Sequence, residues 1–264
     1  KLFKDKKIFL LSFLFLSSCI EDAPLDSLSP AGPYARSIDE LFWLTFWIAV
    51  GVFAIVQGAL LFSVFYFKER ESSPEPKQIH GNNFLEILWT IIPVLILAVI
   101  AVPTVRTIFD LAREPEDALK IEVIGHQWWF EYKYPDFGIT TANVLVIPED
   151  RPVRLEMWSN DVLHNYWVPK LNGKRYLVPG QTTYLNLQAD SPEEFWAQCG
   201  EYCGLSHSKM RGRVISMTEE DFASWVANEQ SYAQKELPES SLAAEGQVVY
   251  LNAGCTQCHV IDGV

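Results

Sequence analysis

Two long apolar runs dominate the first half of the chain. Residues 41–67 contain no charged side chain, and residues 84–108 contain only Glu86 and Arg106, one near each end. A bilayer core of about 30 Å is crossed by roughly 20 apolar residues in a helix. Both runs are long enough, so the pattern predicts two transmembrane helices joined by a short polar loop, residues 68–83.

The hydrophobic pattern changes after the second run. Alternation of apolar and polar side chains, the period of a β-strand, occurs in residues 119–124, 153–158 and 183–187. Turn signals such as Pro179-Gly180 separate these segments. Several short strands without a helical period predict an all-β sandwich or barrel. A helix is predicted to follow at residues 218–228, because Thr218 and Asp221 form a variant of the capping box.

The first residues have the composition of an export signal. Lysines precede a short apolar stretch, residues 8–16, and the sequence Leu16-Ser-Ser-Cys19 follows. This ending resembles a bacterial lipobox, in which Cys19 is acylated, and an ordinary signal peptide is the alternative. Export of the N-terminus followed by two spans places the loop 68–83 in the cytoplasm, in agreement with its three basic side chains. Residues beyond about 109 are then expected outside the membrane.

Charge and cysteine content narrow the possible partners. The 264 residues carry a formal net charge of −12 and contain five cysteines. This charge argues against nucleic-acid binding, which requires a basic surface, and it suits a basic protein partner. An odd number of cysteines does not fit a simple disulfide framework.

One short segment concentrates soft metal ligands. Two thiolates, an imidazole and a thioether occur within twelve positions, at Cys199, Cys203, His207 and Met210. Sulfur ligands combined with imidazole select copper, and two cysteines four positions apart in a tight loop can bridge two copper ions. A second histidine is then required, and His164 is the obvious candidate. A disulfide between the two cysteines, or a zinc site that includes His207, are the alternatives.

A second motif lies near the end of the sequence. Cys255, Cys258 and His259 form the C-x-x-C-H signature of covalent c-type haem attachment, with His259 as the proximal iron ligand. A chance match or a disulfide is the alternative. Residues 246–254 look like the first helix of a class I cytochrome c, although no methionine follows His259 to complete the iron ligation.

Several of these segments together resemble cytochrome c oxidase subunit II over roughly residues 40–228. The resemblance rests on the helix hairpin, the segment that begins Gly125-His-Gln-Trp-Trp-Phe, the His164 segment and the cysteine loop. It implies a cupredoxin-like barrel with a dinuclear copper A centre.

In that family two cysteines bridge the coppers, which assigns this role to Cys199 and Cys203. The resemblance further implies that His164 and His207 each bind one copper, and that Met210 and the backbone carbonyl of Glu201 are weak ligands. The Glu201 carboxylate is expected to reach a magnesium or manganese ion at the interface with subunit I.

Trp128 matches the family position at which a cytochrome delivers its electron, so it is expected near the surface above the copper. The family usually has Trp-Tyr-Trp here, whereas this chain has Trp-Trp-Phe. Core packing is the alternative for these aromatic residues, and we accept it for Trp129 and Phe130. Asp161 is expected to contribute to a docking patch.

The expected organisation is a two-helix transmembrane hairpin, an all-β cupredoxin-like barrel and the start of an all-α cytochrome c domain. Its parts are a lipoprotein-type signal peptide (1–18), a periplasmic segment (19–40), two helices (41–67 and 84–108) around a cytoplasmic loop (68–83), the copper domain (109–228), a linker (229–241) and the beginning of the cytochrome domain (242–264).

The resemblance implies a function in the bacterial inner membrane. Electrons from cytochrome c or another periplasmic donor would pass through the c-type haem and copper A to haem a of subunit I, with subunit III also in the complex. The chain would not be catalytic alone. A copper-A nitric oxide reductase subunit and a membrane-anchored electron shuttle are the alternatives, whereas quinol oxidase relatives lack the copper ligands.

Glu86 generates a first prediction. It lies at the start of the second apolar run, where the helix dipole favours an acid, and Glu86-Ile-Leu-Trp89 also resembles the family segment whose glutamate opens a proton-uptake path into subunit I. We expect Glu86→Gln to slow oxygen consumption while the copper content stays unchanged. An unchanged steady-state rate would contradict this role.

Overall fold

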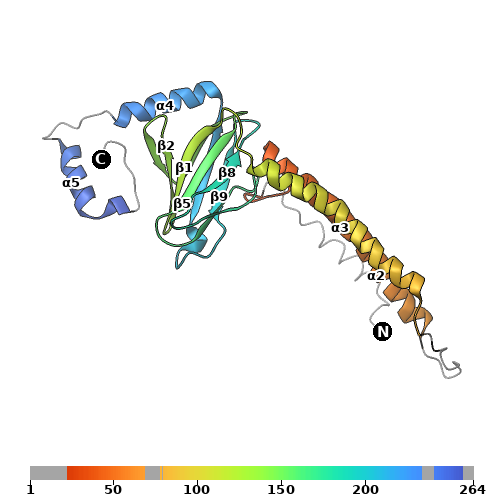
Figure 1. The fold of residues 1–264 in the computed structure, drawn as a ribbon. Coiled ribbons are helices and arrows are strands. Elements are labelled where there is room, and N and C mark those ends of the chain that lie inside the picture. The colour runs from red at the N-terminus through yellow and green to blue at the C-terminus, as the bar shows by residue number, and fades with distance from the viewer. Residues whose placement is uncertain (1–22, 69–77, 79, 234–240, 258–264) are drawn as a thin grey trace, which may run out of the picture.

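A computed structural model describes residues 23–68, 78, 80–233 and 241–257 of the chain. A pair of long helices extends from one end of a β-barrel, and further helices lie on the other side of the barrel (Figure 1). The proposed signal peptide and Cys19 lie outside the described residues, as do Cys258 and His259.

The two long helices confirm the predicted hairpin. Helix α2 spans Pro33–Tyr66 and helix α3 spans Asn83–Ala112, and both are long and apolar enough to cross a membrane. Each begins before its apolar run because favourable starting residues precede the run, and α3 also continues past residue 108 to Ala112. Pro33 occupies the first turn of α2, where its fixed φ suits a helix. The side chain of Asn82 accepts hydrogen bonds from the amides of Phe84 and Leu85 and so caps α3.

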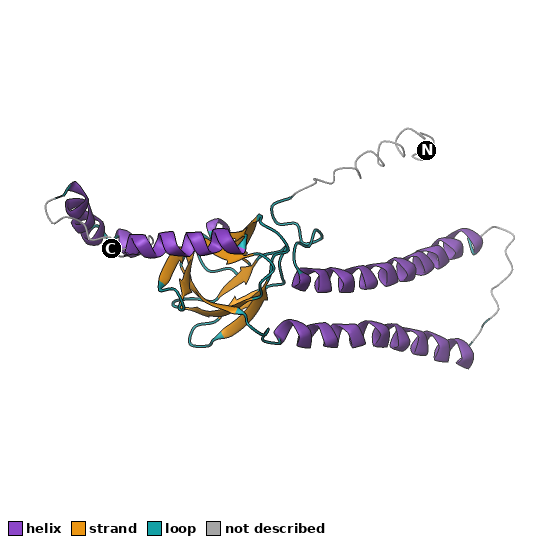
Figure 2. Cartoon of the chain, turned by 90° about the horizontal axis from the view of Figure 1, so that it is seen from above, coloured by secondary structure: helices purple, strands orange, loops and turns teal. Residues whose placement is uncertain are grey.

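Ten strands form the barrel as two five-stranded sheets (Figure 2). The first sheet has the order β3-β2-β1-β5-β8 and the second β4-β10-β9-β6-β7. The strand bounds are β1 Leu119–His126, β2 Trp129–Tyr134, β3 Ile139–Ala142, β4 Val144–Pro148, β5 Val153–Ser159, β6 His164–Trp167, β7 Arg175–Leu177, β8 Thr183–Leu187, β9 Glu194–Cys199 and β10 Arg211–Met217.

Side chains from both sheets alternate into a common core. Ile121, Val123, Phe130, Leu155 and Val214 are fully buried there, as expected for strands with one face against a core. Two parallel pairs, β1 with β5 and β4 with β10, are combined with antiparallel neighbours. The predicted all-β cupredoxin-like architecture is therefore confirmed.

Helix α4, Glu219–Ala233, follows β10 and packs on the barrel. Its predicted cap forms, since Oγ1 of Thr218 accepts from the amide of Asp221 at 3.1 Å and bonds to the carboxylate of Asp221 at 2.8 Å. Phe222 of this helix is buried and packs against Phe137 of the barrel. The helix runs beyond the expected residue 228, where Gln230 donates to the carbonyl of Phe137 at 2.8 Å.

The C-terminal segment is helical where the structure describes it. Helix α5, Leu242–Asn252, is capped by Ser241, and the short helix η3, Cys255–Gln257, follows it. None of the α5 side chains is buried. The segment thus has the helical start that the sequence predicts.

The end of α3 is bonded to the barrel. The side-chain amide of Asn186 on β8 donates to the carbonyls of Leu111 and Arg113 at 3.0 and 2.7 Å, which supplies partners to carbonyls that a helix end leaves free. At the start of α2, Arg36 forms an ion pair with Asp190. The hairpin is therefore attached at the end of the barrel where β1 begins, and the opposite end of β1, roughly 25 Å away, is free to carry a site.

Candidate metal centre

Three neighbouring strands of the second sheet bring the predicted ligands together at one end of the barrel. Strand β9 lies between β6 and β10 and is antiparallel to both, so the end of β9 meets the starts of β6 and β10. Cys199 ends β9, His164 begins β6 and Met210 immediately precedes β10. Cys203 lies in the loop after β9, and His207 begins the short helix η2, His207–Lys209.

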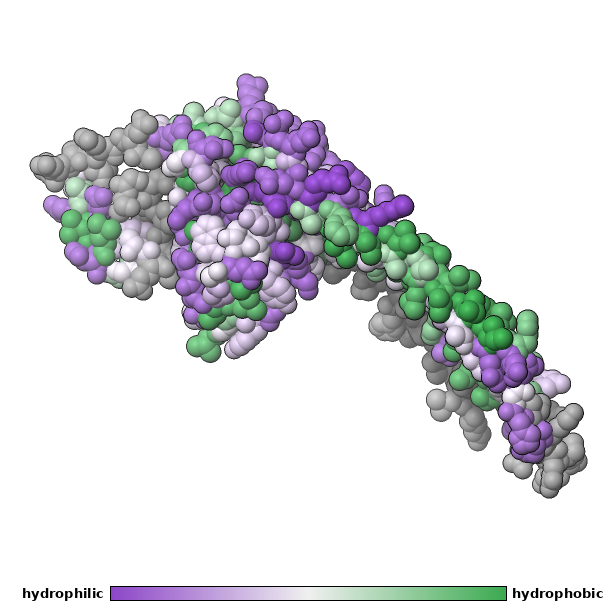
Figure 3. Space-filling model, in the orientation of Figure 1, coloured by the Kyte–Doolittle hydropathy of each residue, from purple (hydrophilic) through white to green (hydrophobic). Residues whose placement is uncertain are grey.

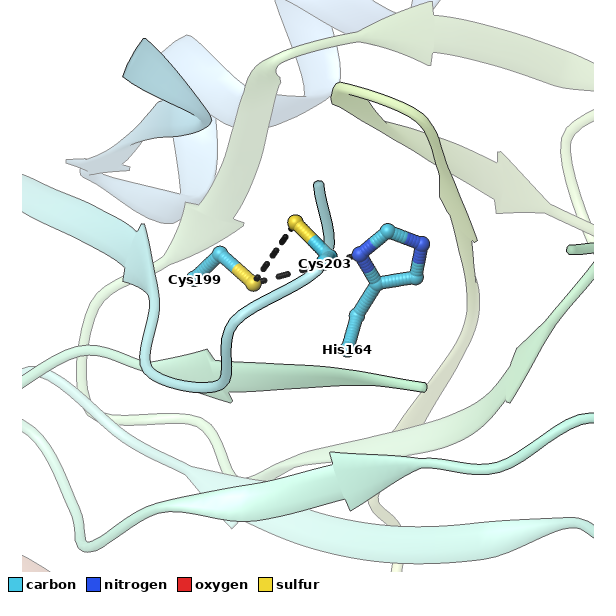
Figure 4. Close-up of side chains that lie close together, drawn as sticks. All are labelled: His164, Cys199 and Cys203. Atoms are coloured by element: carbon cyan, nitrogen blue, oxygen red, sulfur yellow. Dashed lines mark hydrogen bonds between the residues drawn. The ribbon is translucent and has the colours of Figure 1, made fainter. Parts of the chain in front are cut away.

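The two sulfur atoms lie close together without a bond. The Sγ atoms of Cys199 and Cys203 are 3.8 Å apart, and both cysteines are free (Figure 4). A disulfide would place them about 2.05 Å apart. The Nδ1 atom of His164 lies 3.9 Å from the Cys199 sulfur, and Nδ1 of His207 lies 3.6 Å from the Cys203 sulfur. Each imidazole thus lies beside one sulfur, His164 beside Cys199 and His207 beside Cys203.

Two weaker donors complete the cluster. The Sδ atom of Met210 lies 3.7 Å from the Cys203 sulfur, and the carbonyl oxygen of Glu201 lies 3.2 Å from the Cys199 sulfur. Metal–sulfur bonds of about 2.3 Å in a tetrahedral site give ligand separations of about 3.7 Å. The spacing and the thiolate, imidazole and thioether donors therefore fit soft metal ions, and this donor set selects copper.

Backbone hydrogen bonds fix the ligand loop before any metal is added. The amide of Cys199 donates to the carbonyl of Met210 at 3.0 Å, and the amide of Gly200 donates to the carbonyl of Asn165 at 2.9 Å. A Cβ atom at Gly125 would lie 2.8 Å from Cδ2 of His164, so glycine is required where β1 passes the imidazole. The site is consequently preorganised by the sheet.

The two thiols differ in acidity. Burial acts to raise the pKa of Cys199, but hydrogen bonds from His164 and from nearby backbone groups outweigh it and lower the pKa to about 6. Burial and the negative charge of Cys199 raise the pKa of Cys203 to about 12. A metal bound through both sulfurs requires both thiols in the thiolate form, so rising pH favours metal binding.

Asp161 has a structural role that the sequence did not indicate. One carboxylate oxygen, Oδ1, lies 2.7 Å from Nε2 of His164 and accepts the amide of Val162 at 2.6 Å. The other, Oδ2, accepts the amide of Gln127 at 2.6 Å. The bond to Nε2 orients the His164 ring so that Nδ1 faces the sulfurs. The only signal in the sequence was the three-residue spacing between Asp161 and His164.

The loop between β1 and β2 closes over the cluster from the other sheet. Nε1 of Trp128 donates to the carbonyl of Cys203 at 3.2 Å, and the side-chain amide of Gln127 donates to the same oxygen at 2.7 Å. Trp128 is half-buried, whereas Trp129 and Phe130 are buried. Gln127 was not singled out in the sequence, because nothing in its local pattern shows which loop it faces.

The remaining candidate residues lie apart from the cluster. Glu86 is exposed in the first turn of α3, at the far end of the hairpin. The Glu201 carboxylate bonds to the hydroxyl of Tyr176 and raises the pKa of that tyrosine. Cys255 is half-buried in η3, and its partners in the haem motif are outside the described residues.

Comparison with known proteins identifies the family. Family models described as "Cytochrome C oxidase subunit II, periplasmic domain" and "transmembrane domain" match residues 138–217 and 26–107. The chain is 37% identical to cytochrome c oxidase subunit 2 of Alkalihalophilus pseudofirmus over 274 residues, covering 100% of this chain and 79% of the relative. It is 33% identical to cytochrome c oxidase subunit 2 of Bacillus subtilis over 267 residues, covering 94% and 74%.

The relatives also include quinol oxidase subunit 2 of Bacillus subtilis, which is 33% identical over 239 residues, covering 86% of this chain and 72% of the relative. Among solved structures, the periplasmic domain of subunit II of cytochrome oxidase from Bradyrhizobium japonicum is 25% identical, with a TM-score of 0.43, and covers 46% of this chain and 98% of that chain.

The fold and the matched segments define a membrane-anchored β-barrel protein with two spans. The chain belongs to the cytochrome c oxidase subunit II family.

Asp161 generates a prediction about metal affinity. Asp161→Asn removes the carboxylate that orients His164, and loss of such a partner lowers metal affinity by about 10- to 100-fold. Copper titration of the purified protein against a competing chelator measures the change. Asp136→Asn, an exposed position in the turn between β2 and β3, removes the same charge and serves as the control. Equal affinities of both variants would contradict the orienting role.

Proposed function

We propose that this chain is the electron-accepting subunit of a haem–copper terminal oxidase. It passes electrons from cytochrome c through a c-type haem and a dinuclear copper A centre to haem a of subunit I, where oxygen reduction is coupled to proton pumping. The observation that carries this proposal is the convergence of two unbonded cysteine sulfurs with two imidazoles, a thioether and a carbonyl at one edge of the barrel.

The ligand roles follow from which donor faces which sulfur. The sulfurs of Cys199 and Cys203 would hold both metals, and His164 and His207 would each supply one further ligand through Nδ1. Asp161 would hold the His164 ring in place through Nε2. Met210 and the carbonyl of Glu201 are the weak ligands. When bound, the dinuclear copper supplies reversible one-electron chemistry shared between two metals. The chain's own part is to hold these donors at fixed separations inside a rigid barrel.

Electron input occurs through the surface around Trp128. Tyr202 and Leu205, in the ligand loop, are 73% and 93% exposed, and Val162 and Leu163 are exposed beside His164. Large apolar side chains so exposed next to a buried site are typical of a docking surface for another protein. The indole of Trp128 donates to the carbonyl of Cys203 and so connects this surface directly to the ligand loop.

The donor is a cytochrome rather than a quinol. Relatives named quinol oxidase subunit 2 and cytochrome c oxidase subunit 2 are both 33% identical to this chain, so overall identity does not decide the donor. The copper-binding donor set and the C-x-x-C-H motif of Cys255, Cys258 and His259 both favour one-electron delivery from a c-type haem. That haem would be carried on residues 242–264, after the linker 229–241.

The remaining roles complete the assembly. The chain lies in the bacterial inner membrane with residues beyond 109 on the periplasmic side, and Cys19 carries a lipid after removal of residues 1–18. Subunits I and III are its partners. The Glu201 carboxylate holds a magnesium or manganese ion at the subunit I interface, and Glu86 opens the proton-uptake path.

Metal analysis with electron paramagnetic resonance tests the copper centre. We expect about two copper ions per chain that share one unpaired electron, because both sulfurs bridge. Cys203→Ser is expected to remove the shared-electron signal, whereas Ser208→Ala in η2 removes a hydroxyl from the same loop without touching a donor and serves as the control. Zinc as the only bound metal, or a disulfide between Cys199 and Cys203, would contradict the proposal.

Replacement of Trp128 tests the electron path. Trp128→Ala removes the indole between the exposed surface and the carbonyl of Cys203, so we expect reduction of copper by cytochrome c to slow by about tenfold or more, equivalent to at least ~1.4 kcal/mol of barrier. Stopped-flow absorbance of the assembled complex measures this rate. Trp196→Ala, an aromatic residue on the barrel that contacts Arg213 instead, is the matched control. Equal slowing in both variants would contradict a specific path through Trp128.

A further inference from the structure

A pocket of about 410 Å³ lies where the last turns of α3 meet the side of the barrel. Ile108 and Leu111 of α3 form part of its wall, and Arg154 of β5 and Leu185 of β8 form another part. The pocket is separate from the ligand cluster, since none of the candidate metal ligands lines it.

The pocket concentrates positive charge in an acidic chain. Arg154, Lys174 and Arg175 line it, and none of the described residues that line it is acidic. The whole chain carries a formal net charge of −12, so this distribution is unlike that of the molecule as a whole. Cations gathered in a partly enclosed space favour an anionic ligand, and a guanidinium favours phosphate because its N–H donors match the oxygens.

Arg154 supplies a donor that the described protein does not use. Its side chain is held by Nη1, which donates to Oδ1 of Asn186 at 2.8 Å, and it stacks over the ring of Tyr184 at 4.5 Å. The residue is only 7% exposed, and its buried Nε has no hydrogen-bond partner among the residues that the structure describes. Buried polar groups in folded proteins are nearly always hydrogen-bonded, so the guanidinium of Arg154, which lines the pocket, lacks a partner that a ligand of the pocket can supply.

The height of the pocket relative to the membrane indicates the source of that ligand. Helix α3 has 30 residues and is therefore about 45 Å long, compared with about 30 Å for the hydrocarbon core. The apolar run ends near residue 108, and Arg106, Asp110 and Arg113 are charged, so the last turns of α3 belong at the level of the lipid head groups. Below the pocket the exposed surface of α3 is apolar, with Val105 and Ile108 exposed, and this hydrophobic surface continues along the helix up to the polar barrel (Figure 3).

We propose that this pocket binds the phosphate group of an anionic phospholipid from the outer leaflet. The guanidinium of Arg154 donates to a phosphate oxygen, Lys174 and Arg175 neutralise the remaining charge, and an acyl chain lies along the apolar surface of Val105 and Ile108. A lipid accounts for both the cationic lining of the pocket and the apolar surface of α3 beside it. A free phosphate would leave that apolar surface without a ligand. The site joins the membrane anchor to the barrel.

The test uses the assembled oxidase complex, purified through a tag on this chain and incubated with phosphatidylglycerol or phosphatidylcholine before native mass spectrometry. We expect retention of phosphatidylglycerol in preference to phosphatidylcholine, and about tenfold weaker retention by the double variant Lys174→Gln, Arg175→Gln, since two charge-assisted contacts are lost. Lys133→Gln combined with Arg213→Gln removes the same charge elsewhere on the barrel and should retain the lipid.

Arg154→Lys tests the unpaired donor itself, because it keeps the charge and removes Nε. Weaker retention of phosphatidylglycerol with an unchanged copper signal supports the proposal and excludes a general loss of folding. Equal retention by all variants would overturn it. Displacement of the lipid by millimolar inorganic phosphate would overturn the lipid assignment, and cross-linking of Lys174 to a partner subunit that fills the pocket would overturn the whole proposal.

Discussion

The antiparallel pairing of β9 with both β6 and β10 is the constraint on which the candidate site depends. In the observed register Cys199 lies opposite Tyr166, and Gln198 lies opposite Arg211. Because side chains alternate between the two faces of a sheet, a shift of one residue would turn the Cys199 sulfur away from the core side. The pairing therefore brings the cysteine loop beside His164, which is thirty-five positions earlier in the chain.

The surrounding barrel holds the ligand residues in place by giving hydrogen-bond partners to their polar groups. Burial excludes water from the sulfurs, and the carboxylate of Asp161 is hydrogen-bonded to Nε2 of His164. Two side chains from the opposite sheet, Gln127 and Trp128, donate hydrogen bonds to the carbonyl of Cys203. Contacts from both sheets leave the ligand loop little freedom to rearrange. An electron-transfer site benefits from this rigidity, since ligands that do not move between oxidation states need little reorganisation.

The helix hairpin and the candidate site occupy opposite ends of β1, and this separation suits the proposed function. Hydrogen bonds from Asn186 attach the barrel to the end of α3. The ion pair of Arg36 with Asp190 attaches it to the start of α2. The exposed residues Tyr202 and Leu205 are then directed away from the membrane, where a soluble or tethered donor can reach them. The cationic pocket around Arg154 lies at the other end, where the last turns of α3 meet the barrel.

The sequence alone determined the elements and most of the candidate ligands. Long apolar runs with few charges predict helices in a membrane, and alternation predicts strands. The close spacing of Cys199, Cys203, His207 and Met210 confines these donors to one loop whatever the fold. Only the tertiary structure decided what distant segments add to it. Strand register and the closing of two sheets set three features: the hydrogen bond that the Asp161 carboxylate accepts from His164, the contacts of Gln127 and Trp128 with Cys203, and the unpaired Nε of Arg154. Local residue patterns carry no information about these, because they are set by which strands become neighbours.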